Sequence, residues 1–229
     1  MLNLNSRKKE LSEKYNIDFD KLEKEQIKLA KSLEIKDKID ISQIDKFGAI
    51  NTIFLKNTLI CCFVVCDKNF EIIDRAYVSE KVKFPYFPGF RSYRELPSMI
   101  SVFEKLNEKP DIVFISGLGI AHPRLGLASH FGLVTGLPTI GLSNSLIGCT
   151  IKGEKIEDGN DILRDGKRVG KVLISKKGSK PIFVSPGNHI SVSNSYKISK
   201  DLIIAPHKRP EPLHLAGKYS KEVMRELRA

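Results

Sequence analysis

The spacing of apolar positions changes along this chain, and each change predicts a different kind of element. In the first 45 residues apolar side chains recur at irregular helical spacing among Lys and Glu, at Phe19, Leu22, Ile27, Leu29, Ala30 and Leu33. This spacing predicts an N-terminal helix with a solvated face of lysines. Because no repeat or low-complexity linker divides the rest, we expect residues 1–45 to be a helical extension packed on the core and 46–229 to be one domain.

The remainder of the chain begins with strand patterns and continues with alternating helices and strands. Three runs rich in β-branched and aromatic residues, 47–55, 58–67 and 71–79, predict an antiparallel meander. Helices are then expected over 95–107, 123–135 and 218–228, and buried strands at 111–115, 138–142, 169–175 and 181–185. The predicted fold class is α/β, with a mixed central sheet of meander and parallel strands flanked by helices.

Composition adds limits on location and redox state. The longest apolar stretch, residues 58–66, is too short to span a membrane, and the N-terminal residues lack the hydrophobic region of a signal peptide. We therefore expect a soluble, cytoplasmic protein without a membrane partner. Neighbours on a strand point to opposite faces, so Cys61 and Cys62 cannot hold one metal and are expected, with Cys66, to be buried thiols.

The charge balance favours a polyanionic partner. The chain has 38 Lys and Arg against 27 Asp and Glu, a net charge of +11, which attracts nucleic acid. A generally lysine-rich proteome or a hot habitat would give the same balance. Charge alone therefore leaves the partner open.

Two segments carry candidate chemistry. The strand at 111–115 leads into a glycine-rich turn, where Gly117 and Gly119 allow close approach to a phosphate and His122 to Arg124 are expected at a helix N-terminus. The loop over 84–95 is stiffened by prolines, and we expect it to present the aromatic faces of Tyr86, Phe87 and Phe90 to bases. The alternatives are that the turn only connects two elements and that the loop caps a core.

Taken together, these segments resemble the endonuclease V family, whose members cut DNA or RNA near deaminated bases, chiefly inosine. The resemblance is collinear over residues 47–216, and its pieces are Phe84 to Phe90 with Arg94-Glu95, Gly119 to Arg124, Ala128 to Gly132, Pro138 to Gly141, Val184 to Gly187 and Arg209 to Pro212. It implies an RNase H-like fold and a Mg²⁺ cofactor.

The resemblance also implies roles for individual positions. Tyr86 and its loop match the wedge inserted beside the altered base, which is flipped into a pocket. Glu95 matches the catalytic, metal-binding glutamate, and His122 matches the histidine of the glycine motif. The residues expected to contact nucleic acid are Pro85, Tyr86, Phe87, Pro88, Gly89, Arg91, Gly117, Gly119, Ile120 and Arg124.

Four positions depart from the family pattern. Asn51 and Ser116 stand where the family has the two aspartates that hold Mg²⁺, Leu118 replaces a polar residue, and Asn144 replaces a lysine. Mg²⁺ is usually held by one or two carboxylates, and Glu95 is the one expected to remain. Asp111 lies too far along its strand to substitute, whereas Glu80 and Glu211 are conceivable substitutes.

Three hypotheses follow. The first is a protein that binds inosine-containing DNA or RNA and has lost most or all metal-dependent cleavage. The second is an active Mg²⁺-dependent endonuclease with rearranged ligands. The third is a structural or regulatory subunit that pairs with another protein, for which Leu118 would provide an apolar contact in the old cleft.

Overall fold

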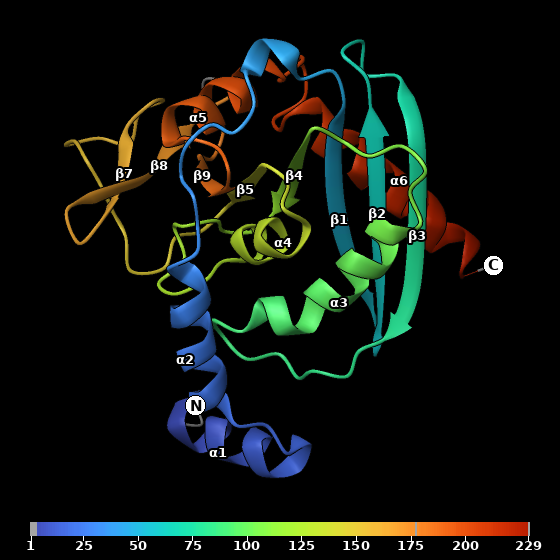
Figure 1. The fold of residues 1–229 in the computed structure, drawn as a ribbon, viewed down its shortest axis with the longest axis vertical. Coiled ribbons are helices and arrows are strands. Elements are labelled where there is room, and N and C mark those ends of the chain that lie inside the picture. Colours follow the sequence, from blue (N-terminus) through green and yellow to red (C-terminus); the bar gives the residue numbers. More distant parts are fainter. Residues whose placement is uncertain (1–3, 177, 229) are drawn as a thin grey trace.

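The computed structural model describes residues 4–176 and 178–228, and within them one mixed sheet organises the molecule (Figure 1). The strand order is β3-β2-β1-β4-β5-β9-β8-β7-β6. The strands are β1 (Phe47–Leu55), β2 (Thr58–Cys66), β3 (Ile72–Lys81), β4 (Ile112–Ser116), β5 (Thr139–Ser143), β6 (Thr150–Ile151), β7 (Asp161–Arg164), β8 (Lys167–Leu173) and β9 (Ile182–Asn188).

The pairing directions confirm the predicted topology. β1, β2 and β3 pair antiparallel, and β4 and β5 then continue from β1 as parallel neighbours. Antiparallel pairing from β5 through β9 to β6 completes the sheet. The mixed sheet, with a meander followed by parallel strands, is therefore as the sequence predicts.

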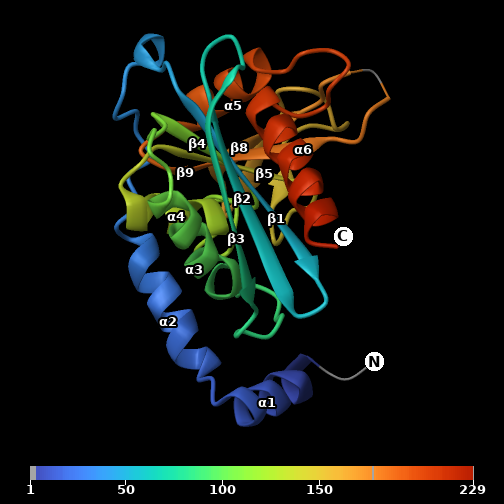
Figure 2. The same cartoon turned by 90° about the vertical axis from the view of Figure 1, so that its right-hand side faces the viewer.

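Helices cover both faces of the sheet (Figure 2). α3 (Arg91–Glu104) and α4 (Leu127–Thr135) lie on one face, and α5 (Val192–Asp201) and α6 (Glu211–Glu226) lie on the other. Successive residues of β1 point to opposite faces of the sheet. Ile50 packs in the core on the α3 side, which contains Met99, and Ala49 packs in the core on the α6 side, which contains Ala216. Burial on both faces explains why β2 is apolar along its whole length.

Buried thiols in β2 confirm the prediction for its cysteines. Cys61, Cys62 and Cys66 are free and buried. Burial raises the pKa of Cys62 to about 11 and that of Cys66 to about 12, so both thiols stay protonated at neutral pH. They pack as small apolar side chains.

Several boundaries differ from the predictions. The N-terminal segment forms two helices, α1 (Leu4–Tyr15) and α2 (Phe19–Ala30), where one was expected, because Asp18 caps a second helix by accepting a hydrogen bond from the Lys21 amide. α6 begins at Glu211 and not at 218, and α5, β6 and β7 were not predicted. None of the helices in the described ranges is long and apolar enough to cross a membrane.

Candidate nucleic-acid site

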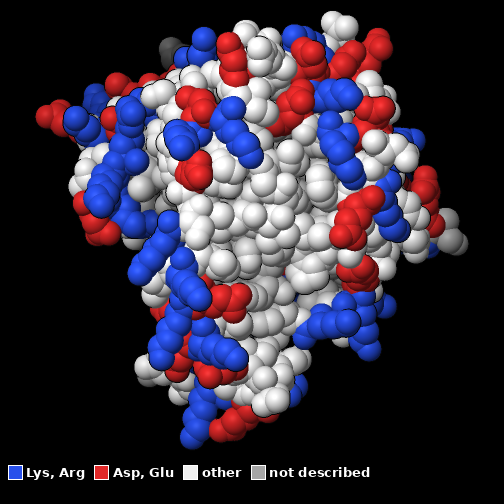
Figure 3. Space-filling view, in the orientation of Figure 1, with Lys and Arg blue, Asp and Glu red and all other residues white. Residues whose placement is uncertain are grey.

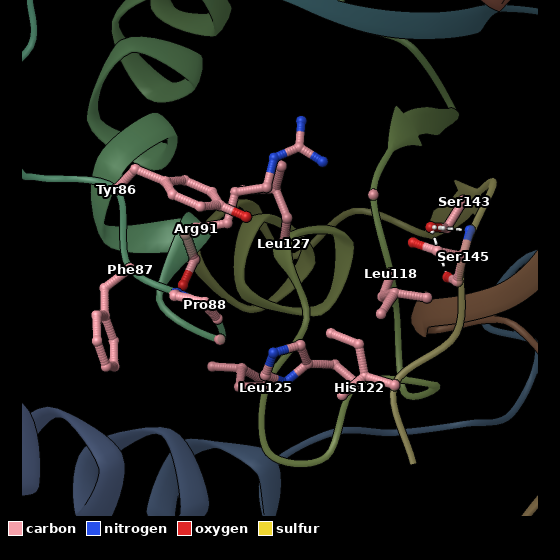
Figure 4. Close-up of a pocket in the computed structure, with 14 residues that line it drawn as sticks. Tyr86, Phe87, Pro88, Arg91, Leu118, His122, Leu125, Leu127, Ser143 and Ser145 are labelled. Carbon is pink, nitrogen blue, oxygen red and sulfur yellow. Dashed lines mark hydrogen bonds between the residues drawn. The ribbon is translucent and has the colours of Figure 1, made fainter. Parts of the chain in front are cut away.

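A cavity of about 250 Å³ opens between the 84–90 loop, the glycine turn and the turn after β5. Figure 4 shows Tyr86 and Pro88 on one side of it, Leu118 and Ser143 on the other, and Leu125 between them. The lining residues are Tyr86, Phe87, Pro88, Gly89, Arg91, Ser92, Gly117, Leu118, His122, Leu125, Leu127, Ser143, Ser145 and Ile147. The structure thus brings together most candidates from the two segments, while Pro85, Gly119, Ile120 and Arg124 do not line the cavity.

The glycine turn is shaped by packing against β9. A Cβ at Gly119 would lie 2.0 Å from the Pro186 carbonyl oxygen, so only glycine fits. The Gly119 amide donates to Ser185 Oγ at 2.9 Å, and the Ile120 amide donates to the Pro186 carbonyl at 2.8 Å. These two donors are used within the protein, so Gly119 and Ile120 support the turn from inside.

The expected helix N-terminus at residues 122–124 is wrong. α4 begins at Leu127 with Gly126 as its N-cap, and the preceding residues form a loop. The Arg124 guanidinium donates to Gln26 Oε1 at 2.7 Å and Glu23 Oε1 at 2.9 Å, both on α2, and it stacks over the Phe90 ring. Arg124 therefore ties α2 to the 84–90 loop, and this geometry does not place it against a phosphate.

The aromatic residues of the 84–90 loop divide into two groups. Phe87 and Phe90 are buried against Phe19 of α2, with ring centroids 4.9 and 5.1 Å from it. Tyr86 is 57% exposed. The expectation that all three rings face bases is therefore wrong for Phe87 and Phe90, which cap a core, and Tyr86 remains the exposed ring at the cavity.

Through Phe19, α2 supports the 84–90 loop from below. We expect Phe19→Ala to lower the free energy of unfolding by about 3 kcal/mol, because the side chain is fully buried and its removal leaves a void under the loop. Urea unfolding followed by circular dichroism measures the change. Ile27→Ala on the same helix is the control, since Ile27 is 48% exposed and should change stability little; equal losses in both variants would contradict the supporting role.

His122 lines the cavity as a neutral imidazole. Burial, with a smaller contribution from Arg124 and Arg164, lowers the pKa of His122 to about 4. Its Nδ1 accepts a hydrogen bond from the Arg124 amide at 3.1 Å, so the proton of the neutral ring is on Nε2. Arg164, which the sequence did not single out, holds this segment by donating to the carbonyls of Ala121 and His122.

Glu95 is fully engaged by neighbouring side chains. It is 2% exposed, and its two oxygens accept from Arg91 Nε at 2.5 Å and Arg91 Nη2 at 2.9 Å. Thr52 Oγ1 also donates to Oε2 at 2.8 Å, and Arg91 Nη1 donates to the Ser116 carbonyl at 2.8 Å. A guanidinium therefore bridges Glu95 and the end of β4, and one helical turn separates the paired residues.

The two neutral positions and the possible substitutes have partners of their own. Asn51 Nδ2 donates to Ser220 Oγ at 2.8 Å, and Ser116 Oγ accepts from Arg209 Nη1 at 3.2 Å. Glu80 accepts a hydrogen bond from Ser98, and the Glu211 carboxylate is hydrogen-bonded to the His207 ring.

The other two positions that depart from the family pattern differ in exposure. Asn144 is exposed in the turn between Ser143 and Ser145, and Leu118 is 8% exposed in an apolar cluster with Phe183. Leu118 is therefore mostly buried, and the part of its side chain that remains accessible lines the cavity.

A family model described as Endonuclease V matches residues 27–218. The chain belongs to the endonuclease V family. It is 37% identical to the endonuclease V of Thermosipho melanesiensis over 186 residues, 78% of this chain and 80% of the relative, and 32% identical to that of Archaeoglobus fulgidus over 215 residues, 92% and 96%.

Solved endonuclease V structures share the fold. The Bacillus subtilis protein superposes with a TM-score of 0.82 at 29% identity, covering 92% of this chain and 93% of that one. Ciona intestinalis endonuclease V, solved with a 24mer DNA containing an inosine followed by a ribo-adenosine, gives a TM-score of 0.82 at 23% identity, covering 91% and 98%. The RNase H-like fold expected from the sequence is thereby confirmed.

Endonuclease V enzymes are generally metal-dependent, so the fit of Mg²⁺ to these residues can be tested. Mg²⁺ keeps a rigid octahedral shell and usually needs at least one or two carboxylates. Here one carboxylate, Glu95, is paired with a guanidinium, while Asn51 and Ser116 bring no charge and Arg209 adds a second cation. The residues present do not fit a magnesium site.

Proposed function

We propose that this member of the endonuclease V family binds inosine-containing DNA or RNA and that its metal-dependent cleavage is lost or strongly reduced. The observation that carries the proposal is a cavity beside the exposed Tyr86 ring, flanked by a guanidinium that is paired with Glu95. The inosine-containing DNA bound by the Ciona intestinalis relative supports the choice of ligand.

The small volume and mixed lining of the cavity support a single flipped base as its ligand. Its volume of about 250 Å³ is below the ~300–1,000 Å³ of pockets for larger ligands. Leu118, Leu125 and Leu127 provide apolar surface, while Ser143 and His122 provide polar groups. Enzymes that read flipped bases combine apolar packing with hydrogen bonds to the base edge.

His122 offers a reason for selecting inosine over adenosine. Its Nε2 carries the proton when Nδ1 accepts from Arg124, so the ring has one donor for a ligand. Hypoxanthine presents an acceptor oxygen where adenine presents a donor amino group. A donor from His122 would therefore favour hypoxanthine and leave adenine with an unpaired polar group.

Phosphate attraction supports the binding side of the proposal. Lys81 and Lys83 are exposed immediately before the 84–90 loop, and the chain carries a net charge of +11. Figure 3 shows Lys and Arg interspersed with Asp and Glu around the rim of one face, while the middle, over α4, has few charges. Counterion release from such contacts makes affinity fall steeply as salt rises.

Binding to labelled oligonucleotides tests the proposal. We expect an inosine-containing strand to bind more tightly than a matched adenosine strand, and Tyr86→Ala to weaken inosine binding about tenfold, because stacking on a base contributes about 1–3 kcal/mol. Fluorescence anisotropy at several salt concentrations measures both effects.

Ile204→Ala is the control for Tyr86→Ala. Ile204 is a large exposed side chain, 43% accessible, between α5 and α6, and it does not line the cavity. The control should leave affinity unchanged. Equal affinity for inosine and adenosine strands would refute inosine recognition, and equal losses in both variants would remove Tyr86 from the binding site.

A further inference from the structure

The start of α6 brings together three side chains of types that can bind a metal ion. The ligand atoms of His207, Glu211 and His214 all lie within 4.8 Å of one another. His207 Nδ1 lies 2.6 Å from Glu211 Oε2, and the two imidazole rings stack with centroids 3.5 Å apart. This cluster is unusual among the described side chains because it joins two imidazoles with a carboxylate that is 8% exposed.

The local backbone holds the three residues in place. Glu211 is the first residue of α6 and His214 lies three positions later, so both side chains lie on the same helix face. The Glu211 amide donates to the Leu202 carbonyl at 2.8 Å, and the His207 amide donates to the Ile204 carbonyl at 2.8 Å. The turn before α6 therefore brings His207 against that face.

The cluster lies outside the 250 Å³ cavity. α6 lies on the face of the sheet opposite α3 and α4, as Figure 2 shows, and none of the three residues lines the 250 Å³ cavity. His207 and His214 are both partly exposed, so an ion can reach the cluster from solvent.

We propose that His207, Glu211 and His214 bind a divalent transition metal ion, with Zn²⁺ as the preferred class. Two imidazole nitrogens and one carboxylate oxygen suit Zn²⁺, whereas Mg²⁺ prefers oxygen ligands alone. Metal–ligand bonds of about 2.0–2.2 Å place tetrahedral ligand atoms about 3.3 Å apart. The two imidazole rings are stacked, so they must rotate out of the stack for their nitrogens to converge on one ion. The fourth position is left to water.

Metal binding here would reach the Glu95 region through Arg209. A bound ion would join the turn at His207 to α6. Arg209 lies between His207 and Glu211 in the chain, and its guanidinium donates a hydrogen bond to Ser116 Oγ. A bound ion would fix the segment that carries this guanidinium. It would also stabilise the folded chain, because an ion that binds only the native state shifts unfolding by mass action.

Zinc binding to the purified chain, stripped with chelator and desalted, tests the proposal. We expect one Zn²⁺ per chain by isothermal titration calorimetry and a rise in melting temperature of about 5 °C at saturating zinc. His207→Ala and His214→Ala should each weaken zinc binding at least about tenfold. Lys208→Gln, an exposed change on the same turn, should leave it unchanged.

Cobalt substitution distinguishes this site from a cysteine site. Cys149 is the partly exposed cysteine of the described residues, whereas Cys61, Cys62 and Cys66 are buried. Co²⁺ bound by nitrogen and oxygen gives visible d–d bands without the thiolate-to-metal charge-transfer band that ligation by Cys149 would produce. Circular dichroism of each metal-free variant checks that it folds. The proposal is overturned if the histidine variants bind zinc like the unchanged chain, if Cys149→Ser abolishes binding, or if the unchanged chain binds no zinc.

Discussion

Restoring the two missing carboxylates is expected to raise metal-dependent cleavage of inosine-containing strands at least about 100-fold over the unchanged chain, which should cleave at background level. The variant is Asn51→Asp with Ser116→Asp. Together with Glu95 it supplies the carboxylates that a divalent ion needs, and positioned metal contributes several kcal/mol to phosphodiester hydrolysis. A gain of 100-fold corresponds to about 2.7 kcal/mol of transition-state stabilisation.

Arg91 should limit this gain, because its guanidinium is bonded to both oxygens of Glu95. Adding Arg91→Met to the double variant is expected to increase the rate further by releasing Glu95. Gel assays with Mg²⁺ or Mn²⁺ measure cleavage, and Glu95→Gln in the same background should return it to background. Cleavage by the unchanged chain that Glu95→Gln abolishes would instead establish the active enzyme with rearranged ligands.

Acidification between pH 6.5 and 4 is expected to destabilise the fold through two buried histidines. Burial lowers the pKa of both His122 and His130 from 6.5 to about 4. Both rings are therefore neutral in the folded chain at pH values where the unfolded chain binds protons. The stability is present above pH 6.5 and is lost as the pH falls toward 4, by up to roughly 3 kcal/mol per group.

His130→Leu separates this effect from general acid unfolding. His130 is 7% exposed and lies on α4, with its Nδ1 buried and without a hydrogen-bond partner in the described structure. The variant should lose less stability than the unchanged chain between pH 6.5 and 4. Urea unfolding at several pH values measures the free energy of unfolding of both chains. If this free energy falls equally with pH in both, the buried His130 ring is not a cause of the acid destabilisation. At Asp158 the effect of burial is outweighed by hydrogen bonding, chiefly from Lys200, which lowers the pKa of its carboxyl. A hydrogen bond from Lys171 lowers the pKa of Asp161. The stability that these two carboxylates contribute is therefore lost only below this pH window.

The sequence could indicate the strands because their burial follows from local composition. Residues 47–55 and 58–66 appear in the structure with nearly the predicted bounds, since continuous apolar runs between turn residues leave few other ways to bury them. Helix starts were less predictable. α3 begins at Arg91 inside the aromatic segment and α4 begins after the expected position, because loop packing decides where the first turn forms.

By itself, the sequence determined the family, the antiparallel meander followed by parallel strands, and the absence of acidic side chains at Asn51 and Ser116, since these depend on residue identity and on collinear motifs. Only the tertiary structure decided which candidate side chains are available. It paired Arg124 with α2, buried Phe87 against Phe19 and bonded Arg91 to Glu95. It also gathered His207, Glu211 and His214. A charged or aromatic residue looks the same in sequence whether it faces a ligand or another part of the chain, because its partner is chosen by packing between distant segments.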